Sequence, residues 1–239
     1  MKYVITMIRH AKSRSNTGEL QPHLVGDANI DLCAAGHEEA VELGKKLGAK
    51  FLSTATVFCS TYLRTEQTLD GILSGAGLKR EDLKHLVFDD RLVEIDLGDQ
   101  DYESQQESRR KIGWFWYRYK NGESAATVLY RVESFLQDMK AFVRKKTQGK
   151  KNEQVKHIVI ITHGMTVRCI IKALLKLSIE QFELMRNPRN CAVMKVSEKR
   201  KLEKLGLEIQ FTHENLAVAG LRLRKELRSE RYTKGEVES

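Results

Sequence analysis

Short apolar runs alternate along this chain with longer segments in which apolar residues recur at helical spacing. Two of the runs, residues 3–9 and 158–162, are rich in β-branched residues, so each is predicted to be a buried parallel strand. Further strands are predicted at residues 56–59, 86–88, 191–196 and 207–211, and helices at residues 37–50, 62–74, 128–143 and 164–177. This alternation predicts a single α/β domain, built as a three-layer α/β/α sandwich with a mostly parallel central sheet.

Three segments lack regular periodicity. Residues 11–31 are polar and contain glycine, which is typical of a loop. Residues 99–123 include an aromatic cluster at 114–119, with Arg109 before it and Arg118 within it; the cluster can be either part of the core or a cap over a substrate. Residues 213–239 are highly charged and are predicted to form a tail, which leaves residues 1–212 as the domain.

The charge balance favours anionic partners. The chain of 239 residues has 41 Lys and Arg against 32 Asp and Glu, a net charge of +9. Much of the excess lies in stretches such as 144–146 and 199–201, which are typical of solvated surface, and no zinc-finger spacing or other nucleic-acid motif is present. We therefore expect a small phosphorylated substrate and no specific nucleic acid.

The spacing of the cysteines and the length of the apolar runs indicate in which compartment the protein is expected. The four cysteines, Cys33, Cys59, Cys169 and Cys191, are far apart and form no C-x-x-C pair, so all are predicted to be reduced thiols of a cytoplasmic protein. The first strand begins at residue 3, which leaves no room for a signal peptide. No apolar run approaches the ~20 residues that a membrane span needs, so no membrane partner is expected.

A histidine follows each of the strands predicted at residues 3–9 and 158–162. His10 comes directly after Arg9, and His163 precedes Gly164. The carboxyl ends of parallel strands meet at one edge of an open sheet, where ligands usually bind. Two histidines and an arginine at this edge indicate a site that handles phosphate.

Six segments resemble, in order, the motifs of one enzyme family. These segments are Arg9-His10-Ala11 and residues 31–36, 60–68, 92–98, 122–124 and 162–164. Together they resemble the motifs of the histidine phosphatase superfamily, also called phosphoglycerate-mutase-like, over about residues 3–196. The resemblance implies the phosphoglycerate-mutase-like form of the α/β/α sandwich.

The resemblance also implies a role for each site residue. His10 is expected to attack phosphorus and form a phosphohistidine, Glu94 to protonate the leaving group, and His163 to stabilise transition-state charge. Arg9, Arg64, Asn16 and Gly164 are expected to bind the phosphoryl group or the substrate. Because His10 must be neutral to attack, its other ring nitrogen should be held by a backbone acceptor. The basic groups replace a metal ion, so neither a metal nor another cofactor is expected.

The loop after His10 departs from the family pattern. Ala11 stands where glycine is usual, and a backbone that required positive φ there would cost about 1 kcal/mol. Lys12 stands where an acidic or polar residue is common, and Arg14 adds another cation. Either these two side chains make the pocket unusually basic, which would suit a multiply charged substrate, or they point to solvent.

The segment around Glu94 distinguishes the functional alternatives. The mutases usually have Glu-Arg-His-Tyr-Gly, whereas this chain has Glu94-Ile95-Asp96-Leu97-Gly98, which looks like the phosphatase branch. We therefore expect a phosphatase that hydrolyses a phosphomonoester. The alternatives are a 2,3-bisphosphoglycerate-dependent phosphoglycerate mutase and a phosphate-binding module without catalysis. The sequence predicts no particular oligomeric state.

Overall fold

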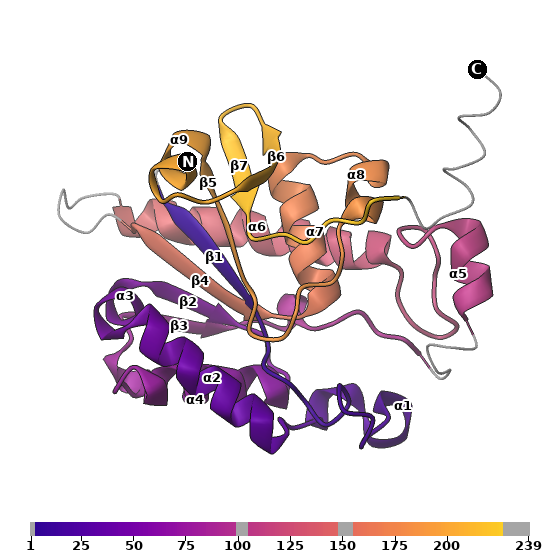
Figure 1. Cartoon of the computed structure of the whole chain (residues 1–239), viewed down its shortest axis with the longest axis horizontal. Coiled ribbons are helices and arrows are strands. Elements are labelled where there is room, and N and C mark those ends of the chain that lie inside the picture. The colour runs from indigo at the N-terminus through magenta and orange to yellow at the C-terminus, as the bar shows by residue number, and fades with distance from the viewer. Residues whose placement is uncertain (1–2, 99–104, 148–154, 227–239) are drawn as a thin grey trace.

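The computed structural model describes residues 3–98, 105–147 and 155–226 (Figure 1). A seven-stranded sheet in the order β3-β2-β4-β1-β5-β7-β6 forms the middle layer. The strands are β1 (Val4–Arg9), β2 (Thr56–Cys59), β3 (His85–Phe88), β4 (His157–Thr162), β5 (Val193–Glu198), β6 (Ile209–His213) and β7 (Leu216–Ala219).

The half of the sheet that contains β1 to β4 is parallel. In the register, Arg9 lies opposite Thr162, and Cys59 lies opposite Ile161. The last residues of β1, β2 and β4 are therefore level to within one residue. Strands β5 and β6 run against this direction, and β7, which is antiparallel to both, runs with β1. The predicted α/β sandwich with a mostly parallel sheet is confirmed.

Two helical layers cover the sheet, and Figure 1 shows α2 and α4 on one side of it and α6 and α7 on the other. The helices are α1 (Pro22–Val25), α2 (Ala34–Leu47), α3 (Ala49–Thr54), α4 (Leu63–Gly75), α5 (Gln106–Ile112), α6 (Ala125–Thr147), α7 (Gly164–Leu175), α8 (Ile179–Leu184) and α9 (Lys199–Lys204). Short 3-10 turns occupy Asp27–Asn29, Arg80–Asp82 and Asp90–Leu92. None of the helices in the described ranges is long and apolar enough to cross a membrane.

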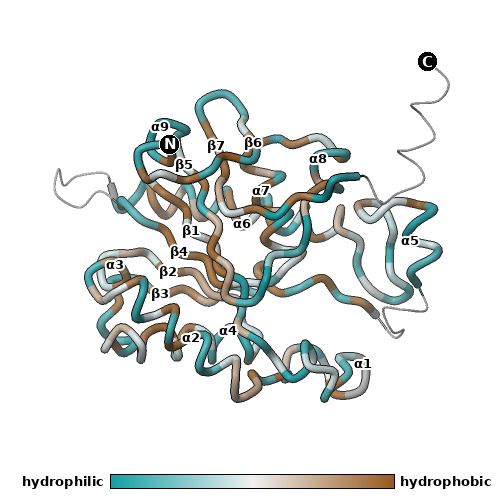
Figure 2. The backbone as a smooth tube through the Cα atoms, in the orientation of Figure 1, coloured by the Kyte–Doolittle hydropathy of each residue, from teal (hydrophilic) through white to brown (hydrophobic). Residues whose placement is uncertain are grey.

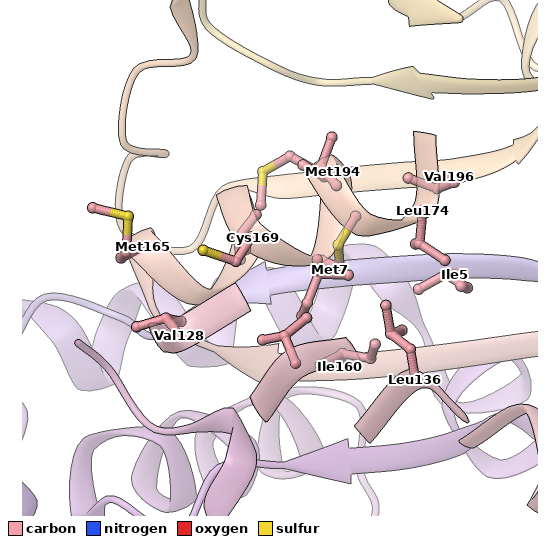
Figure 3. Packing of buried hydrophobic residues seen from close by; sticks show 14 of the residues in the cluster. Ile5, Met7, Val128, Leu136, Ile160, Met165, Cys169, Leu174, Met194 and Val196 are labelled. Carbon is pink, nitrogen blue, oxygen red and sulfur yellow. The ribbon is translucent and has the colours of Figure 1, made fainter. Parts of the chain in front are cut away.

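Alternation along β1 divides the core between the two faces of the sheet. Ile5 and Met7 pack with the residues of α6 and α7, whereas Ile8 packs with those of α2 and α4. Figure 3 shows the first of these clusters, with Met7 and Ile160 facing Cys169 and Leu136. Figure 2 shows hydrophobic residues along the central strands, as expected for strands that are covered on both faces.

The predicted helices and strands are present, with small shifts at their ends. Ser124 caps the N-terminus of the longest helix, because the N–H of Thr127 donates to Ser124 Oγ at 3.2 Å. All four cysteines are free thiols, as predicted. The loop at residues 11–31 contains the short helix α1 and a 3-10 turn.

The prediction of a charged tail from residue 213 is wrong for its first part. Leu216–Ala219 form β7, which lies between β5 and β6 and is mostly buried. This apolar stretch is short enough to be hidden among charged neighbours in the sequence, but it completes the antiparallel half of the sheet. Residues 227–239 of the predicted tail lie outside the described residues.

Helices α2 and α4 pack through glycines. A Cβ on Gly44 of α2 would overlap the carbonyl oxygen of Ile72, and a Cβ on Gly75 of α4 would overlap the carbonyl oxygen of Val41. The two backbones therefore approach closely, which neither helix could do with a larger residue at these points.

We expect Gly44→Ala to destabilise the fold by about 1–3 kcal/mol, because the added methyl forces α2 and α4 apart. For a domain of this size, thermal denaturation should show a decrease in melting temperature of about 2–4 °C per kcal/mol. Lys46→Ala, at an exposed position of the same helix, is the matched control and should leave the melting temperature within about 2 °C. An unchanged melting temperature for Gly44→Ala would contradict the close packing.

Candidate active site

Three polar residues follow the level ends of β1, β2 and β4. His10, Ser60 and His163 are each the first residue after their strand, and all three are buried. The rings of the two histidines lie 5.1 Å apart, centroid to centroid, and Ser60 Oγ is hydrogen-bonded to His163 Nε2 at 2.9 Å. The parallel register therefore brings together side chains that are up to 153 positions apart in the chain, since 163 − 10 = 153.

His10 is held as a neutral imidazole. Its Nδ1 lies 2.8 Å from the carbonyl oxygen of Ala11, and because a carbonyl can only accept, Nδ1 carries the proton. This is the backbone acceptor that the sequence leads us to expect. Burial, together with the charges of Arg64 and Arg9, holds the pKa of His10 well below its usual range. Its Nε2 therefore keeps a lone pair.

His163 lies behind His10. Burial is the main cause that holds its pKa well below the usual range, and the charge of Arg64 adds to it. The ring packs edge-on against Tyr62. Its Nδ1 is buried and has no hydrogen-bond partner within the described part of the chain. Gly164 directly follows as the first residue of α7.

A cavity of about 510 Å³ opens in front of His10. Its walls include the predicted site residues Arg9, His10, Asn16, Arg64 and Glu94. His163 and Gly164 are not on these walls and are buried at the start of α7. A volume of this size is within the range of about 300–1,000 Å³ that is usual for sites of organic ligands.

Two arginines supply positive charge to the cavity. Arg9 donates from Nη1 to the carbonyl oxygen of Pro188 at 2.7 Å, and its buried Nε has no partner among the described residues. Arg64 is 3% exposed and donates from Nη1 to the carbonyl oxygen of Asp27 at 2.6 Å and from Nη2 to Asp27 Oδ2 at 2.9 Å. The planar guanidinium group of each arginine matches the geometry of phosphate oxygens.

Glu94 is positioned by the N-terminus of α7. Its Oε1 accepts the N–H of Met165 at 3.0 Å and that of Ile95 at 3.1 Å. Burial raises the pKa of the carboxyl, and Arg9 opposes that rise. A raised pKa is the shift that a carboxyl needs in order to act as a general acid near neutral pH.

The backbone around Glu94 is fixed by further hydrogen bonds. Arg131 of α6 donates to the carbonyl oxygen of Glu94 at 3.0 Å and to that of Arg91 at 2.6 Å. The same guanidinium pairs with Glu123 at 3.0 Å, and Glu123 Oε2 accepts the N–H of Asp96 at 3.1 Å. The segment that bears Glu94 is therefore held from both sides.

Asn16 closes the loop over His10. Its Oδ1 accepts the N–H of Ser13 at 3.2 Å and the side-chain N–H of Asn190 at 2.9 Å. Asn190 also donates to the carbonyl oxygen of His10 at 3.0 Å. Since Oδ1 is occupied, the NH₂ group of Asn16 is the part that a ligand would meet.

The loop after His10 is unstrained. Ala11 does not have positive φ, its N–H donates to Thr68 Oγ1 at 2.9 Å, and its methyl is buried in the cluster beneath α2 and α4. Neither Lys12 nor Arg14 lines the cavity, and Arg14 pairs with Glu19 at 3.1 Å. The structure therefore favours the second alternative for these two cations, in which they do not make the pocket basic.

Residues of the aromatic segment at 114–119 lie both in the core and on the wall of the cavity. Phe115 is buried and packs against Phe182 with ring centroids 5.1 Å apart, whereas Trp114 and Tyr119 line the cavity. Arg109 of α5 also lines it, donates to Tyr119 Oη at 2.6 Å and stacks 4.2 Å from the Trp114 ring. Residues 99–104, the first part of the proposed cap, lie outside the described residues.

Two residues of the site were missed at the level of sequence. Ser60 could have been found, because it follows a strand as His10 and His163 do. Asp27 gave no such indication, since it lies in a loop. Among residues 3–98, 105–147 and 155–226, no group of three or more His, Cys, Asp or Glu is placed to hold a metal ion.

Comparison with known proteins identifies the family. The model of the histidine phosphatase superfamily (branch 1) matches residues 5–206. The chain is 30% identical over 228 residues to phosphoglycerate mutase-like protein AT74 of Arabidopsis thaliana, with 91% of this chain and 71% of that protein covered. It is 29% identical over 184 residues to a 2,3-bisphosphoglycerate-dependent phosphoglycerate mutase of Mesorhizobium japonicum, with 73% of this chain and 82% of that protein covered.

A solved structure shows the same fold. A mycobacterial glucosyl-3-phosphoglycerate phosphatase superimposes with a TM-score of 0.64 at 22% identity, with 82% of this chain and 91% of that chain covered. The family match spans the sheet from β1 to β5 and includes every residue that the sequence assigns to the site. The chain belongs to the histidine phosphatase superfamily, branch 1.

Proposed function

We propose that this protein is a metal-independent phosphatase that hydrolyses a phosphomonoester through a phosphohistidine on His10. The observation that carries the proposal is the state of His10: it is neutral, its Nδ1 proton is tied to the carbonyl of Ala11, and it lies on a cavity wall. Arg9, Arg64 and Glu94 lie on the walls of the same cavity. The proposed nucleophile, the two positive charges and the proposed acid therefore line one cavity.

In the first half of the reaction, Arg9 and Arg64 hold the oxygens of the phosphoryl group while Nε2 of His10 attacks phosphorus. The bond from phosphorus to the ester oxygen breaks, and Glu94 gives its proton to that oxygen. A general acid contributes about 10²–10⁴-fold to such a step. Because Nδ1 keeps its proton in the hydrogen bond to the carbonyl of Ala11, the imidazole can take the positive charge that forms on it.

In the second half, the ionised Glu94 takes a proton from water, whose oxygen attacks the phosphohistidine. The bond from phosphorus to Nε2 breaks, phosphate leaves, and both His10 and Glu94 return to their starting states. The buried Nδ1 of His163, which has no partner among the residues that the structure describes, and the adjacent α7 N-terminus would support the negative oxygens. Charge that a metal ion supplies in other phosphoryl-transfer enzymes comes here from the arginines.

A mutase is the second candidate, favoured by the identity to the Mesorhizobium enzyme. A mutase must keep the phosphoryl group from water and return it to a second oxygen of the substrate. In this chain Ile95 and Leu97 line the cavity at positions where the mutases usually have arginine and tyrosine. The apolar replacement favours hydrolysis. The third alternative, a binding module without catalysis, loses its support because Ala11 is unstrained.

The proposal predicts release of phosphate from p-nitrophenyl phosphate at a rate that EDTA does not change. His10→Ala should lower kcat by at least about 10³-fold, because the nucleophile is lost, and labelled substrate should leave acid-labile label on the wild type and none on the variant. His37→Ala, at an exposed position of α2, is the matched control. A His10→Ala variant with the wild-type rate would contradict the assignment.

The same preparation separates hydrolase from mutase. With 3-phosphoglycerate and a bisphosphoglycerate primer, a hydrolase releases inorganic phosphate and forms no 2-phosphoglycerate. Rapid formation of 2-phosphoglycerate without loss of phosphate would establish the mutase instead.

Glu94→Gln should lower the rate of hydrolysis most for esters with poor leaving groups. An alkoxide needs a proton as it leaves, whereas p-nitrophenolate leaves without one. We therefore expect a loss of about 10²–10⁴-fold for alkyl phosphates and a loss at least tenfold smaller for the burst of p-nitrophenol in the first turnover. Glu66→Gln, on the partly exposed side of α4, is the control. Equal losses of rate for both leaving groups would contradict the proposal that Glu94 is the acid.

The pH dependence of kcat/KM should favour the acid side of neutrality. The reaction needs neutral His10, whose lowered pKa keeps it unprotonated in mildly acidic solution, and protonated Glu94, whose pKa burial raises. Activity should thus decrease as the pH rises through the pKa of Glu94. In Glu94→Gln this alkaline decrease should disappear, while any decrease from titration of the substrate phosphate stays. An alkaline limb that is unchanged in the variant would show that another group controls it.

A further inference from the structure

We infer that Asp27 and Asp96 make the cavity selective for phosphomonoesters of neutral or cationic alcohols, and unfavourable to esters whose alcohol portion carries a carboxylate or a second phosphate. The inference rests on the proposed phosphatase activity and names its substrate class. It differs from the multiply charged substrate that the sequence alone allowed.

The carboxylate of Asp27 offsets part of the positive charge of Arg64, the arginine proposed to bind the phosphoryl group. It begins a 3-10 turn in the loop at residues 11–31 and lies on the cavity wall. Its carbonyl and its carboxylate occupy both terminal nitrogens of Arg64, at 2.6 and 2.9 Å. The Asp27 side chain is 27% exposed, so its negative charge is open to a bound molecule. A phosphoryl group at Arg64 would therefore lie close to a fixed carboxylate.

Asp96 places a second carboxylate on the same cavity. It follows Glu94 by two residues and also lies on the wall. Its Oδ1 accepts the N–H of Gly98 at 2.8 Å, and Glu123 fixes its backbone by accepting the N–H of Asp96 and by donating its own N–H to the Asp96 carbonyl. Burial raises the pKa of Tyr62 to about 12, with contributions from both Asp27 and Asp96. Both carboxylates therefore act on the same side chain, that of Tyr62.

Three cations lie on the described walls, Arg9, Arg64 and Arg109, against the carboxylates of Asp27 and Asp96. Glu94 also lines the cavity but is protonated at the start of the proposed reaction, so it adds no negative charge there. Arg9 and Arg64 are taken by the phosphoryl group in the proposed reaction, and Arg109 stacks on Trp114. Lys12 and Arg14, which would have added positive charge, are not on the walls. A further negative charge on the alcohol would meet like charge at short range, where repulsion in a partly buried site is strong.

Carboxylates also favour particular groups. An ionised carboxylate accepts hydrogen bonds from hydroxyls and binds ammonium groups more strongly still. Asp27 and Asp96 therefore attract the hydroxyl or amine of an alcohol that remains after the phosphoryl group is bound. Ile95 and Leu97, on the same wall, are suited to its carbon skeleton.

The test compares glycerol 3-phosphate with 3-phosphoglycerate. The two esters have the same phosphorylated carbon and differ by a hydroxymethyl group in place of a carboxylate. For the wild type we expect kcat/KM to favour glycerol 3-phosphate by about tenfold or more, the effect of one unfavourable charge contact. Asp27→Asn should reduce this ratio by at least about threefold, mainly through a lower KM for 3-phosphoglycerate.

Asp70→Asn is the matched control. It removes the same charge from α4, where Asp70 pairs with Arg80 at 2.6 Å and is 53% exposed, away from the cavity. The ratio should then remain that of the wild type. If Asp27→Asn fails to fold, Asp96→Asn carries the same expectation.

A wild-type ratio of one or below, or a ratio that Asp27→Asn and Asp96→Asn both leave unchanged, would overturn the inference. If p-nitrophenyl phosphate and both esters are not hydrolysed, the proposed function fails instead. The selectivity is then read from calorimetric binding of the two esters to the wild type and to Asp27→Asn, with the same expected ratios and the same overturning results.

Discussion

The level ends of three parallel strands are the constraint on which the site depends. Because β1, β2 and β4 are in register, the residues that follow them meet at one edge of the sheet. A one-residue slip of β4 would move His163 away from His10 and turn the apolar side chains of the strand to the opposite layers. The two clusters of buried residues above and below the sheet hold the register. The packing that holds the strands in register therefore also fixes the positions of the two histidines.

The second half of the site is fixed by side chains that take no part in bond making. Arg131 of the long helix α6 donates to the backbone of Glu94. Glu123, which pairs with Arg131, accepts the backbone N–H of Asp96. Thr162 and Thr166 donate to the carbonyl oxygens of Leu92 and Val93 at 2.6 Å each. The loop with the acid is therefore attached to β4, to α6 and to α7. An irregular segment gains in this way the precision of a regular element, which proton transfer over hydrogen-bond distances needs.

Much of the fold could be predicted because apolar periodicity records burial on both faces of a sheet. The strand ends at His10 and His163 follow from that pattern, and family motifs supply Arg64 and Glu94. The pattern fails where burial is decided by distant partners. The strand Leu216–Ala219 is short and lies among charged residues, so only its pairing with β5 and β6 makes it a strand. The contact of Asp27 with Arg64 joins residues 37 positions apart, and no local pattern in a loop reports it.

The hydrogen bond from Met165 to Glu94 has a consequence for the rigidity of the protein during its reaction. Glu94 fills the place of a capping side chain at the positive end of α7, and that same carboxyl is the group proposed to lose and regain a proton. A helix end is better satisfied by an ionised carboxylate than by a neutral one. In the proposed reaction Glu94 is ionised while phosphorus is bound to His10, so the start of α7, next to His163, would be held most firmly at that stage and less firmly once the product has left.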